Sequence, residues 1–209
     1  MAAVLRAHYT RDASAAARPA PAGPLFPVFL KLAGRRVVVV GGGRVAAAKA
    51  ESLLRAGAEV TIVAPEIGAG LERPELTLVR RPFEAGDLDG AWLVVAAAPP
   101  EVNRQVRAAA DERSVFVNAA DDPETASAYA GGVLTRGGVT VAVSSNGEAP
   151  ALAGLLREAL EAVIPEDLER WLAEARAERR RWKRDGVPMP KRRPLLLEAL
   201  NRLYAEAAP

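Results

Sequence analysis

The chain has 209 residues, half of them hydrophobic, which is enough apolar material for a packed core and excludes a chain disordered throughout. Its 28 basic and 26 acidic residues nearly balance, and the lack of cysteine excludes disulfides, cysteine nucleophiles, cysteine-ligated zinc and iron–sulfur clusters. No segment approaches about 18 consecutive apolar residues, so neither a membrane span nor a membrane partner is expected.

The first 23 residues are rich in Ala, Pro and Arg and lack the apolar centre of a secretory signal. We expect residues 1–23 to be a disordered leader; an organelle transit peptide is the alternative, which Asp12 disfavours. The only histidine, His8, lies in this leader, which excludes a histidine triad or histidine metal site in the folded body. We expect a reducing, cytoplasmic location and no resident metal.

A βαβ unit is the first structure that the sequence predicts. Val37–Val40 is an apolar run without alternation, as in a strand buried on both faces of a parallel sheet. Arg44–Arg55 has helical spacing of small and apolar residues, and Gly57 follows as a helix stop. Glu59–Val63 is the second strand.

Three glycines join the first strand to the helix. Gly41, Gly43 and Ala46 fit the G-x-G-x-x-G/A pattern, in which the helix start attracts a pyrophosphate. We therefore expect the backbone of Gly41, Gly42 and Gly43 to leave room for a dinucleotide. The alternative is a plain glycine-rich turn in an α/β protein.

The acidic residue that such domains use for the adenosine ribose is missing at the end of the second strand. Val63 is followed by Ala64, Pro65 and Glu66, so Glu66 or the backbone around Pro65 would contact the ribose. No Arg lies there to favour a 2′-phosphate, which favours NAD over NADP.

Alternation of strands and helices continues up to residue 120. Strands are predicted at Leu76–Arg80, Trp92–Ala96 and Ser114–Asn118, with a helix at about Glu101–Glu112. This pattern predicts an α/β fold with a doubly wound parallel sheet of Rossmann type over residues 24–120.

Two stretches follow strand ends, where ligands of such sheets bind. Ala96–Pro100, with small side chains, should face the cofactor or serve packing alone. In NAADDP, Asn118–Pro123, Asp121 or Asp122 could act as a general base beside a nicotinamide. The alternative is an Asx turn that closes the strand.

A small α+β segment is predicted over residues 121–164. Val133–Thr135 and Val139–Ser144 indicate a hairpin, and a helix begins near Pro150. The helix carries one apolar stripe: Leu152, Leu155, Leu156, Leu160 and Val163. Since this segment is too small to fold alone, we expect it to pack on a second copy of itself.

The loop before this helix offers hydroxyls and free backbone N–H groups. It comprises Ser144, Ser145, Asn146 and Gly147, which could bind a carboxylate or phosphate of the substrate. Helix capping explains the same residues equally well.

Residues 165–209 predict a helical C-terminal region: one charged helix, a break at Gly186–Pro190 and a short helix over Leu195–Tyr204. Arg176–Arg193 holds nine Lys or Arg and two acids. Such a run is most often a solvated helix face. A polyanionic small molecule or a partner subunit could also bind it; without a nucleic-acid motif, no nucleic-acid partner is expected.

Together, these motifs resemble one family. PLFPVFLKLAGRRVVVVGGGRVAAAKAESLLRAGAEVTIVAP, then NAADDP, then VTVAVSSNGEAPALAGLLREALE is similar to the precorrin-2 dehydrogenase / sirohydrochlorin ferrochelatase family, the dehydrogenase module of siroheme synthase. The resemblance spans about residues 24–172. It implies NAD-dependent oxidation of the tetrapyrrole precorrin-2 to sirohydrochlorin, iron insertion as a possible second activity, and an interlocked homodimer. The methyltransferase fused to some members is not expected in a chain of this length.

The resemblance also implies roles for single residues. The family's catalytic aspartate in N-x-x-D-x-P corresponds to Asp121, its loop serine to Ser145, and its cofactor-contacting pair after the glycines to Arg44 and Val45. Many relatives carry Phe and Pro where this chain has Ala128 and Gly131, which puts chelatase competence in question. The rival hypothesis is an NAD-sensing subunit without chemistry.

Overall fold

The computed structural model describes residues 25–119, 122 and 125–205, and the chain divides into two compact units, residues 1–30 and 31–209. Residues 25–30, the described part of the first unit, form no helix or strand, and Phe26 and Phe29 are exposed. The leader expected over residues 1–23 lies outside the described residues. No helix within the described ranges is long and apolar enough to cross a membrane.

The second unit contains a five-stranded parallel sheet in the order β3-β2-β1-β4-β5. Its strands are β1 (Arg36–Val40), β2 (Glu59–Val63), β3 (Leu76–Val79), β4 (Leu93–Ala96) and β5 (Phe116–Ala119). The predicted doubly wound parallel sheet is thereby confirmed. The strand order reverses between β1 and β4, and sheets of this kind bind ligands at the carboxyl ends of the strands flanking that point.

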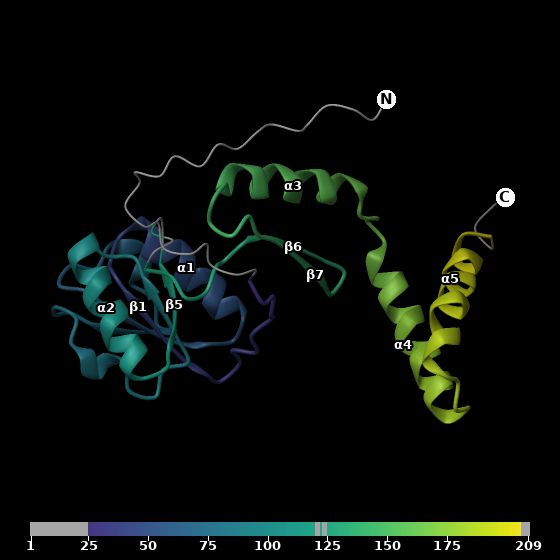
Figure 1. Cartoon of the computed structure of the whole chain (residues 1–209), viewed down its shortest axis with the longest axis horizontal. Helices are drawn as coiled ribbons and strands as arrows, with labels where there is room; N and C mark the ends of the chain where they lie inside the picture. Colours follow the sequence, from purple (N-terminus) through teal and green to yellow (C-terminus); the bar gives the residue numbers. More distant parts are fainter. Residues whose placement is uncertain (1–24, 120–121, 123–124, 206–209) are drawn as a thin grey trace, which may run out of the picture. The chain divides into compact units, whose positions relative to one another are not determined.

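The valine run of β1 is buried on both faces because a helix covers each side of the sheet (Figure 1). Val39 belongs to an apolar cluster with residues of α1 (Arg44–Arg55), whereas the next residue, Val40, belongs to a second cluster with residues of α2 (Pro100–Glu112). Both side chains are at most 2% exposed. This double burial is the reason for the run without alternation.

Two short 3₁₀ helices were not predicted. One, η1 (Ala69–Leu71), follows β2 and packs against α1, and the other, η2 (Ala85–Leu88), takes the place of an α-helix between β3 and β4 and packs against α2. Each ends on a fully buried leucine, Leu71 or Leu88. A single turn is too short to produce the periodic pattern on which sequence prediction depends.

Up to the end of β5, the predicted limits of the strands and helices are correct within two residues, and one difference is informative. The last strand of the sheet begins at Phe116, not at Ser114, because Ser114 has a φ of +54° and lies in the turn after α2. Gly57, with a φ of +76°, ends α1 as predicted.

An antiparallel hairpin and a helix follow the parallel sheet. The hairpin consists of β6 (Gly132–Arg136) and β7 (Val139–Val143), and α3 (Pro150–Val163) packs against both strands. Only Ala153 of α3 is buried. The members of the apolar stripe are 37–79% exposed: Leu152, Leu155, Leu156, Leu160 and Val163.

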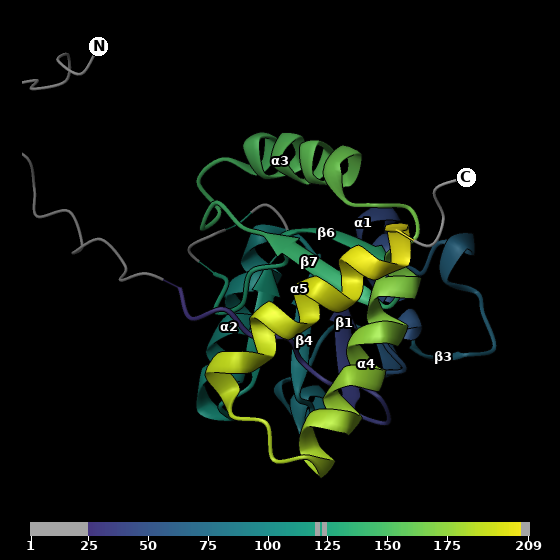
Figure 2. The same cartoon turned by 90° about the vertical axis from the view of Figure 1, so that its right-hand side faces the viewer.

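Two helices that lie side by side complete the chain, α4 (Leu168–Arg184) and α5 (Met189–Ala205) (Figure 2). The predicted break is present but ends at Pro188, because α5 already begins at Met189; the prediction that the second helix starts at Leu195 was wrong. Pro190 lies in the first helical turn, where no backbone N–H is needed. Trp171 of α4 donates a hydrogen bond to the hydroxyl of Tyr204 at 2.5 Å, which joins the two helices near their ends.

Candidate functional site

The first glycine of the loop after β1 is required by the backbone. Gly41 has a φ of +132°, and a β-carbon there would lie 2.3 Å from the carbonyl oxygen of Ala97, which follows β4. The N–H of Gly41 donates to the carbonyl of Val63 at 2.9 Å. The loop is therefore held between the ends of β2 and β4, and only glycine fits this position.

Gly42 is equally constrained, for a reason that the sequence pattern did not give. A β-carbon on Gly42 would lie 1.9 Å from the carbonyl oxygen of Glu66. The N–H of Gly68 donates to the carbonyl of Gly42 at 2.9 Å. The segment after β2 thus packs directly on the glycine loop.

The third glycine borders open space. A β-carbon on Gly43 would meet no atom within 4 Å, and no side chain caps the helix start at this residue. Arg44 and Val45, in the first turn of α1, are exposed, whereas Ala46 is fully buried against the sheet. The helix start therefore offers unobstructed N–H groups and a positive dipole end to an anion.

A cleft of about 540 Å³ opens over this helix start. It is lined by the three glycines together with Val40, Val63, Ala64, Pro65, Glu66, Pro82, Phe83, Ala97, Ala98, Pro99, Val102 and Gln105. Three residues of the stretch after β4 thus line the cleft: Ala97, Ala98 and Pro99. Asn103 fixes that stretch, because its Oδ1 accepts the N–H of Ala98 at 3.1 Å.

The lining residues also bear on the choice of cofactor. Pro65 and Glu66 are exposed at the end of β2, where a ribose would lie. No Arg or Lys is among the residues that line the described cleft. Pro82 and Phe83, which sequence reasoning missed, come from the connection after β3.

The stretch after β5 holds the candidate base. Asp121 lies outside the described residues. Its neighbour Asp122 accepts hydrogen bonds from both the N–H and the hydroxyl of Thr125, and Arg107 of α2 donates to the carbonyl of Thr125 at 3.1 Å. Asp122 thus closes a turn, as the alternative interpretation of this motif expected.

The chain then returns along β5. Ser127 and Ala128 donate their N–H groups to the carbonyl of Val117, and the buried amide of Asn118 donates to the carbonyl of Ala128 at 2.9 Å. Position 128 is therefore fixed by the backbone. Gly131 is similarly tight, since a β-carbon there would lie 2.2 Å from the carbonyl oxygen of Val143.

The loop between β7 and α3 satisfies part of its own backbone. The hydroxyl of Ser144 accepts the N–H of Asn146, and the hydroxyl of Ser145 accepts the N–H of Ala149, each at 3.1 Å. Asn146 has a φ of +56°. The loop borders a pocket of about 200 Å³ lined by Tyr129, Ala130, Gly131, Gly132, Ser144, Ser145, Gly147, Pro150, Ala153 and Gly154.

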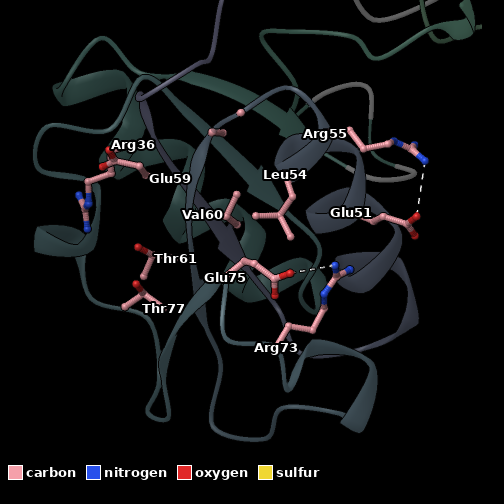
Figure 3. Close-up of a pocket in the computed structure, with 12 residues that line it drawn as sticks. Arg36, Glu51, Leu54, Arg55, Glu59, Val60, Thr61, Arg73, Glu75 and Thr77 are labelled. Atoms are coloured by element: carbon pink, nitrogen blue, oxygen red, sulfur yellow. Dashed lines mark hydrogen bonds and ion pairs between the residues drawn. The ribbon is translucent and has the colours of Figure 1, made fainter.

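A larger hollow, about 820 Å³, lies at the amino ends of β2 and β3 (Figure 3). It is lined by charged side chains that pair with one another, as Arg55 does with Glu51 and Arg73 with Glu75. Ligands of doubly wound sheets bind at the carboxyl ends of the strands. This hollow is therefore at the wrong end of the sheet for the dinucleotide.

Two family descriptions match successive parts of the chain. Residues 28–132, half of the chain, match the family described as "Putative NAD(P)-binding". Residues 136–162 match the family described as "Sirohaem biosynthesis protein central". The first match contains the glycine loop and the second contains the loop before α3.

The chain is also similar to curated proteins described as siroheme synthases. The chain is 42% identical over 184 residues to the siroheme synthase of Photorhabdus laumondii, an alignment covering 86% of this chain and 39% of that protein. It is 41% identical over 172 residues to siroheme synthase 2 of Cronobacter sakazakii, covering 80% and 38%. The chain thus spans less than two fifths of these relatives.

Among solved structures, the chain is similar to one described as SirC, precorrin-2 dehydrogenase. The TM-score is 0.65 and the sequence identity 26%, over 83% of this chain and 88% of that chain. The similarity extends well beyond the parallel sheet, which ends at Ala119.

Proposed function

The chain belongs to the family of the siroheme synthase dehydrogenase modules, precorrin-2 dehydrogenase / sirohydrochlorin ferrochelatase, and on this premise we propose that it oxidises precorrin-2 to sirohydrochlorin with NAD. The open helix start at Gly43, at the floor of the 540 Å³ cleft, is the observation that carries the proposal. A pyrophosphate needs close approach to backbone N–H groups, and only this glycine of the three borders free space.

Different groups of residues at the cleft suit successive parts of a dinucleotide. The N–H groups at Gly43, Arg44 and Val45 would bind the pyrophosphate, and the chain at Pro65 and Glu66 would contact the adenosine ribose. When bound, NAD supplies the hydride acceptor. The absence of Lys and Arg from the described cleft lining supports NAD over NADP, since a 2′-phosphate near Glu66 would meet like charge.

Asp121 is our candidate for the base. Removal of two electrons from precorrin-2 transfers a hydride to the cofactor and leaves a proton, which a carboxylate following β5 can accept. Asp122 already accepts two hydrogen bonds from Thr125 in closing its turn, which supports the assignment of the proton to Asp121. General base catalysis of this kind contributes about 10²–10⁴-fold to a rate.

The loop Ser144–Gly147 is our candidate for the substrate carboxylates. Its hydroxyls and the start of α3 border the 200 Å³ pocket. Precorrin-2 and sirohydrochlorin are polycarboxylates, which such donors suit. We also propose a homodimer, because the exposed stripe of α3 is an unusually long apolar surface to leave in water. For the cysteine-free chain we retain the expectation of a cytoplasmic location.

The direct test is the appearance of the NADH absorbance band when precorrin-2 and NAD are added to the purified chain. We expect turnover with the natural chain, and little turnover but unchanged NAD binding with Asp121→Asn. Equal turnover in that variant would remove Asp121 from the mechanism. Tight NAD binding without any turnover would favour the alternative function, an NAD sensor.

Iron insertion is a separate proposal at the same site. The macrocycle supplies four nitrogens to the metal, so the protein need only accept the pyrrole protons, and Asp121 is again the candidate. The measurement is siroheme formation from sirohydrochlorin and Fe²⁺ or Co²⁺ with and without the protein. A rate equal to the uncatalysed one would mean that the protein is a dehydrogenase without chelatase activity.

A further inference from the structure

One wall of the cofactor cleft comes from a segment outside the helices and strands, although Phe83 of this segment packs against the apolar cluster beneath α2. Pro82 and Phe83 line the cleft from the connection after β3, which ends at Val79. The carbonyl of Val79 accepts the N–H of Ala64 at 3.1 Å, so this wall adjoins the end of β2. Because the end of β2 is where the adenosine ribose binds in such domains, Pro82 and Phe83 line the adenosine half of the cleft.

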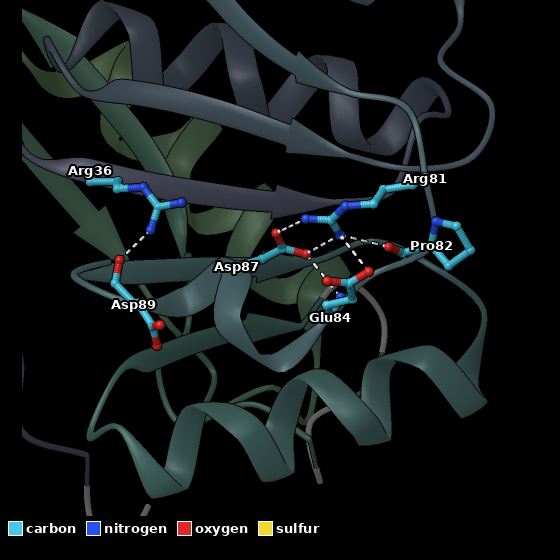
Figure 4. Close-up of polar contacts among 6 residues, drawn as sticks. All are labelled: Arg36, Arg81, Pro82, Glu84, Asp87 and Asp89. Carbon is cyan, nitrogen blue, oxygen red and sulfur yellow. Dashed lines mark hydrogen bonds and ion pairs between the residues drawn. The ribbon is translucent and has the colours of Figure 1, made fainter.

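A pair of opposite charges holds this wall (Figure 4). Arg81 donates to both carboxylate oxygens of Asp87, at 2.6 and 2.9 Å, and its Nη1 also donates to the carbonyl of Pro82 at 2.9 Å. The N–H of Glu84 donates to Asp87 at 2.9 Å. Arg81 also lies 3.8 Å from the carboxylate of Glu84, so one guanidinium and two carboxylates tie residues 81–84 into a closed loop.

The anchor of this loop is buried. The side chain of Asp87 is only 9% exposed, and its neighbour in η2, Leu88, is fully buried in the apolar cluster beneath α2. Burial by itself would raise the pKa of Asp87, but the hydrogen bonds from Arg81 and Glu84 and the charges of Arg81 and Arg36 hold that pKa below its ordinary value. Asp87 therefore remains ionised at neutral pH and keeps Arg81 engaged.

We infer that Arg81 and Asp87 form a positioning pair for the cofactor, which fixes Pro82 and Phe83 as the wall against the adenosine half of NAD. The inference rests on the proposed use of NAD. Neither charged residue lines the cleft, so the pair acts through Pro82 and Phe83 and not by touching the cofactor. With its guanidinium committed to Asp87, Arg81 is also not free to bind a 2′-phosphate.

The test is calorimetric binding of NAD, ADP-ribose and nicotinamide mononucleotide to purified variants. We expect Asp87→Asn and Arg81→Gln to weaken NAD and ADP-ribose about tenfold each and to leave nicotinamide mononucleotide unchanged. The matched control is Arg113→Gln: Arg113 bonds Asp89 at 2.8 Å beyond the other end of η2 and does not line the cleft. It should leave all three affinities unchanged.

A second variant separates positioning from general loss of structure. Phe83→Ala removes the wall itself, so it should weaken ADP-ribose like Asp87→Asn, and combining the two should weaken binding no further. Additive losses, equal losses for nicotinamide mononucleotide, or a selective gain of NADP binding in Asp87→Asn would overturn the inference. If the natural chain binds no NAD at all, the proposed function fails instead.

Discussion

The α-carbon of Gly42 faces the carbonyl oxygen of Glu66 so closely that any β-carbon on Gly42 would lie 1.9 Å from it. The glycine loop and the segment after β2 therefore pack directly against each other, and a change in one must displace the other. Glu66 occupies the region where related sheets carry an acidic ribose ligand. The backbone contact with Gly42 fixes the position of this segment without such a side chain on β2.

Replacement of Gly42 by alanine should accordingly damage both halves of the cleft. We expect Gly42→Ala to lower the free energy of unfolding by about 1–3 kcal/mol, because two backbone segments must separate to admit the methyl group. NAD affinity should fall with it. Denaturant unfolding and calorimetry measure the two effects.

The neighbouring glycine supplies the control. A β-carbon on Gly43 meets nothing within 4 Å, and its φ of −92° suits any residue. Gly43→Ala should therefore leave the unfolding free energy within about 0.5 kcal/mol of the natural value while still weakening NAD. Equal stability of the two alanine variants would contradict the contact at Gly42.

Experiment should distinguish the structural role of Asp122 from the catalytic role that we propose for Asp121. Asp122→Ala removes both hydrogen bonds to Thr125, so we expect a loss of about 1–2 kcal/mol in unfolding free energy. Thr125→Val should cost a similar amount, and the double variant little more, since both residues serve one turn. If the losses of unfolding free energy in the two single variants simply added in the double variant, Asp122 would not stabilise the chain through its hydrogen bonds with Thr125.

The exposed stripe of α3 predicts a concentration-dependent molecular mass. The natural chain should scatter light as a dimer at micromolar concentration, and Leu155→Glu should shift it toward the mass of one chain, because Leu155 is 64% exposed within a single chain. Glu158→Gln, on the polar side of the same helix, is the control. A single-chain mass for the natural protein would reject the dimer.

Local patterns made most of the sheet and its glycine loop predictable. The unbroken apolar run at Val37–Val40 predicts a buried strand, and the spacing of small and apolar residues after the glycines predicts a helix. Both patterns are local in the sequence, and both elements are present as predicted. The role of Gly42 was not predictable, because its contact is with Glu66, far along the chain. Pro82 and Phe83 were missed since a one-turn 3₁₀ helix leaves no repeating pattern around them.

The C-terminal helices show the opposite error, a local signal given too much weight. The prolines correctly indicated a break after α4, but the break ends before Pro190, which lies in the first turn of α5, where proline costs no hydrogen bond. Pro194 removes only one N–H from the hydrogen-bond ladder of a helix that packs against α4. A proline in the first helical turn is compatible with a helix start, and this interpretation of Pro190 would have placed the start of α5 correctly.

The pair of Arg81 and Asp87 predicts how stability depends on pH. The pKa of Asp87 is lower in the folded chain than its ordinary value, despite burial, because of the hydrogen bonds and charges around it. The folded state therefore binds fewer protons at this carboxyl than the unfolded state does. Its contribution to stability is complete above the unfolded pKa of about 3.9 and is lost as the pH falls through the folded value.

Asp87→Asn removes this dependence. At about pH 7 the natural chain should exceed Asp87→Asn by about 1–3 kcal/mol in unfolding free energy, nearer the lower figure because Arg81 is 38% exposed and water screens the pair. The gap should narrow as the pH is lowered toward about 3, measured by urea unfolding at several pH values. Asp111→Asn, which breaks the exposed pair with Arg107, should show a gap below about 0.5 kcal/mol at every pH. A gap for Asp87→Asn that stays constant with pH would mean that Asp87 stabilises the loop through its shape and not through its charge.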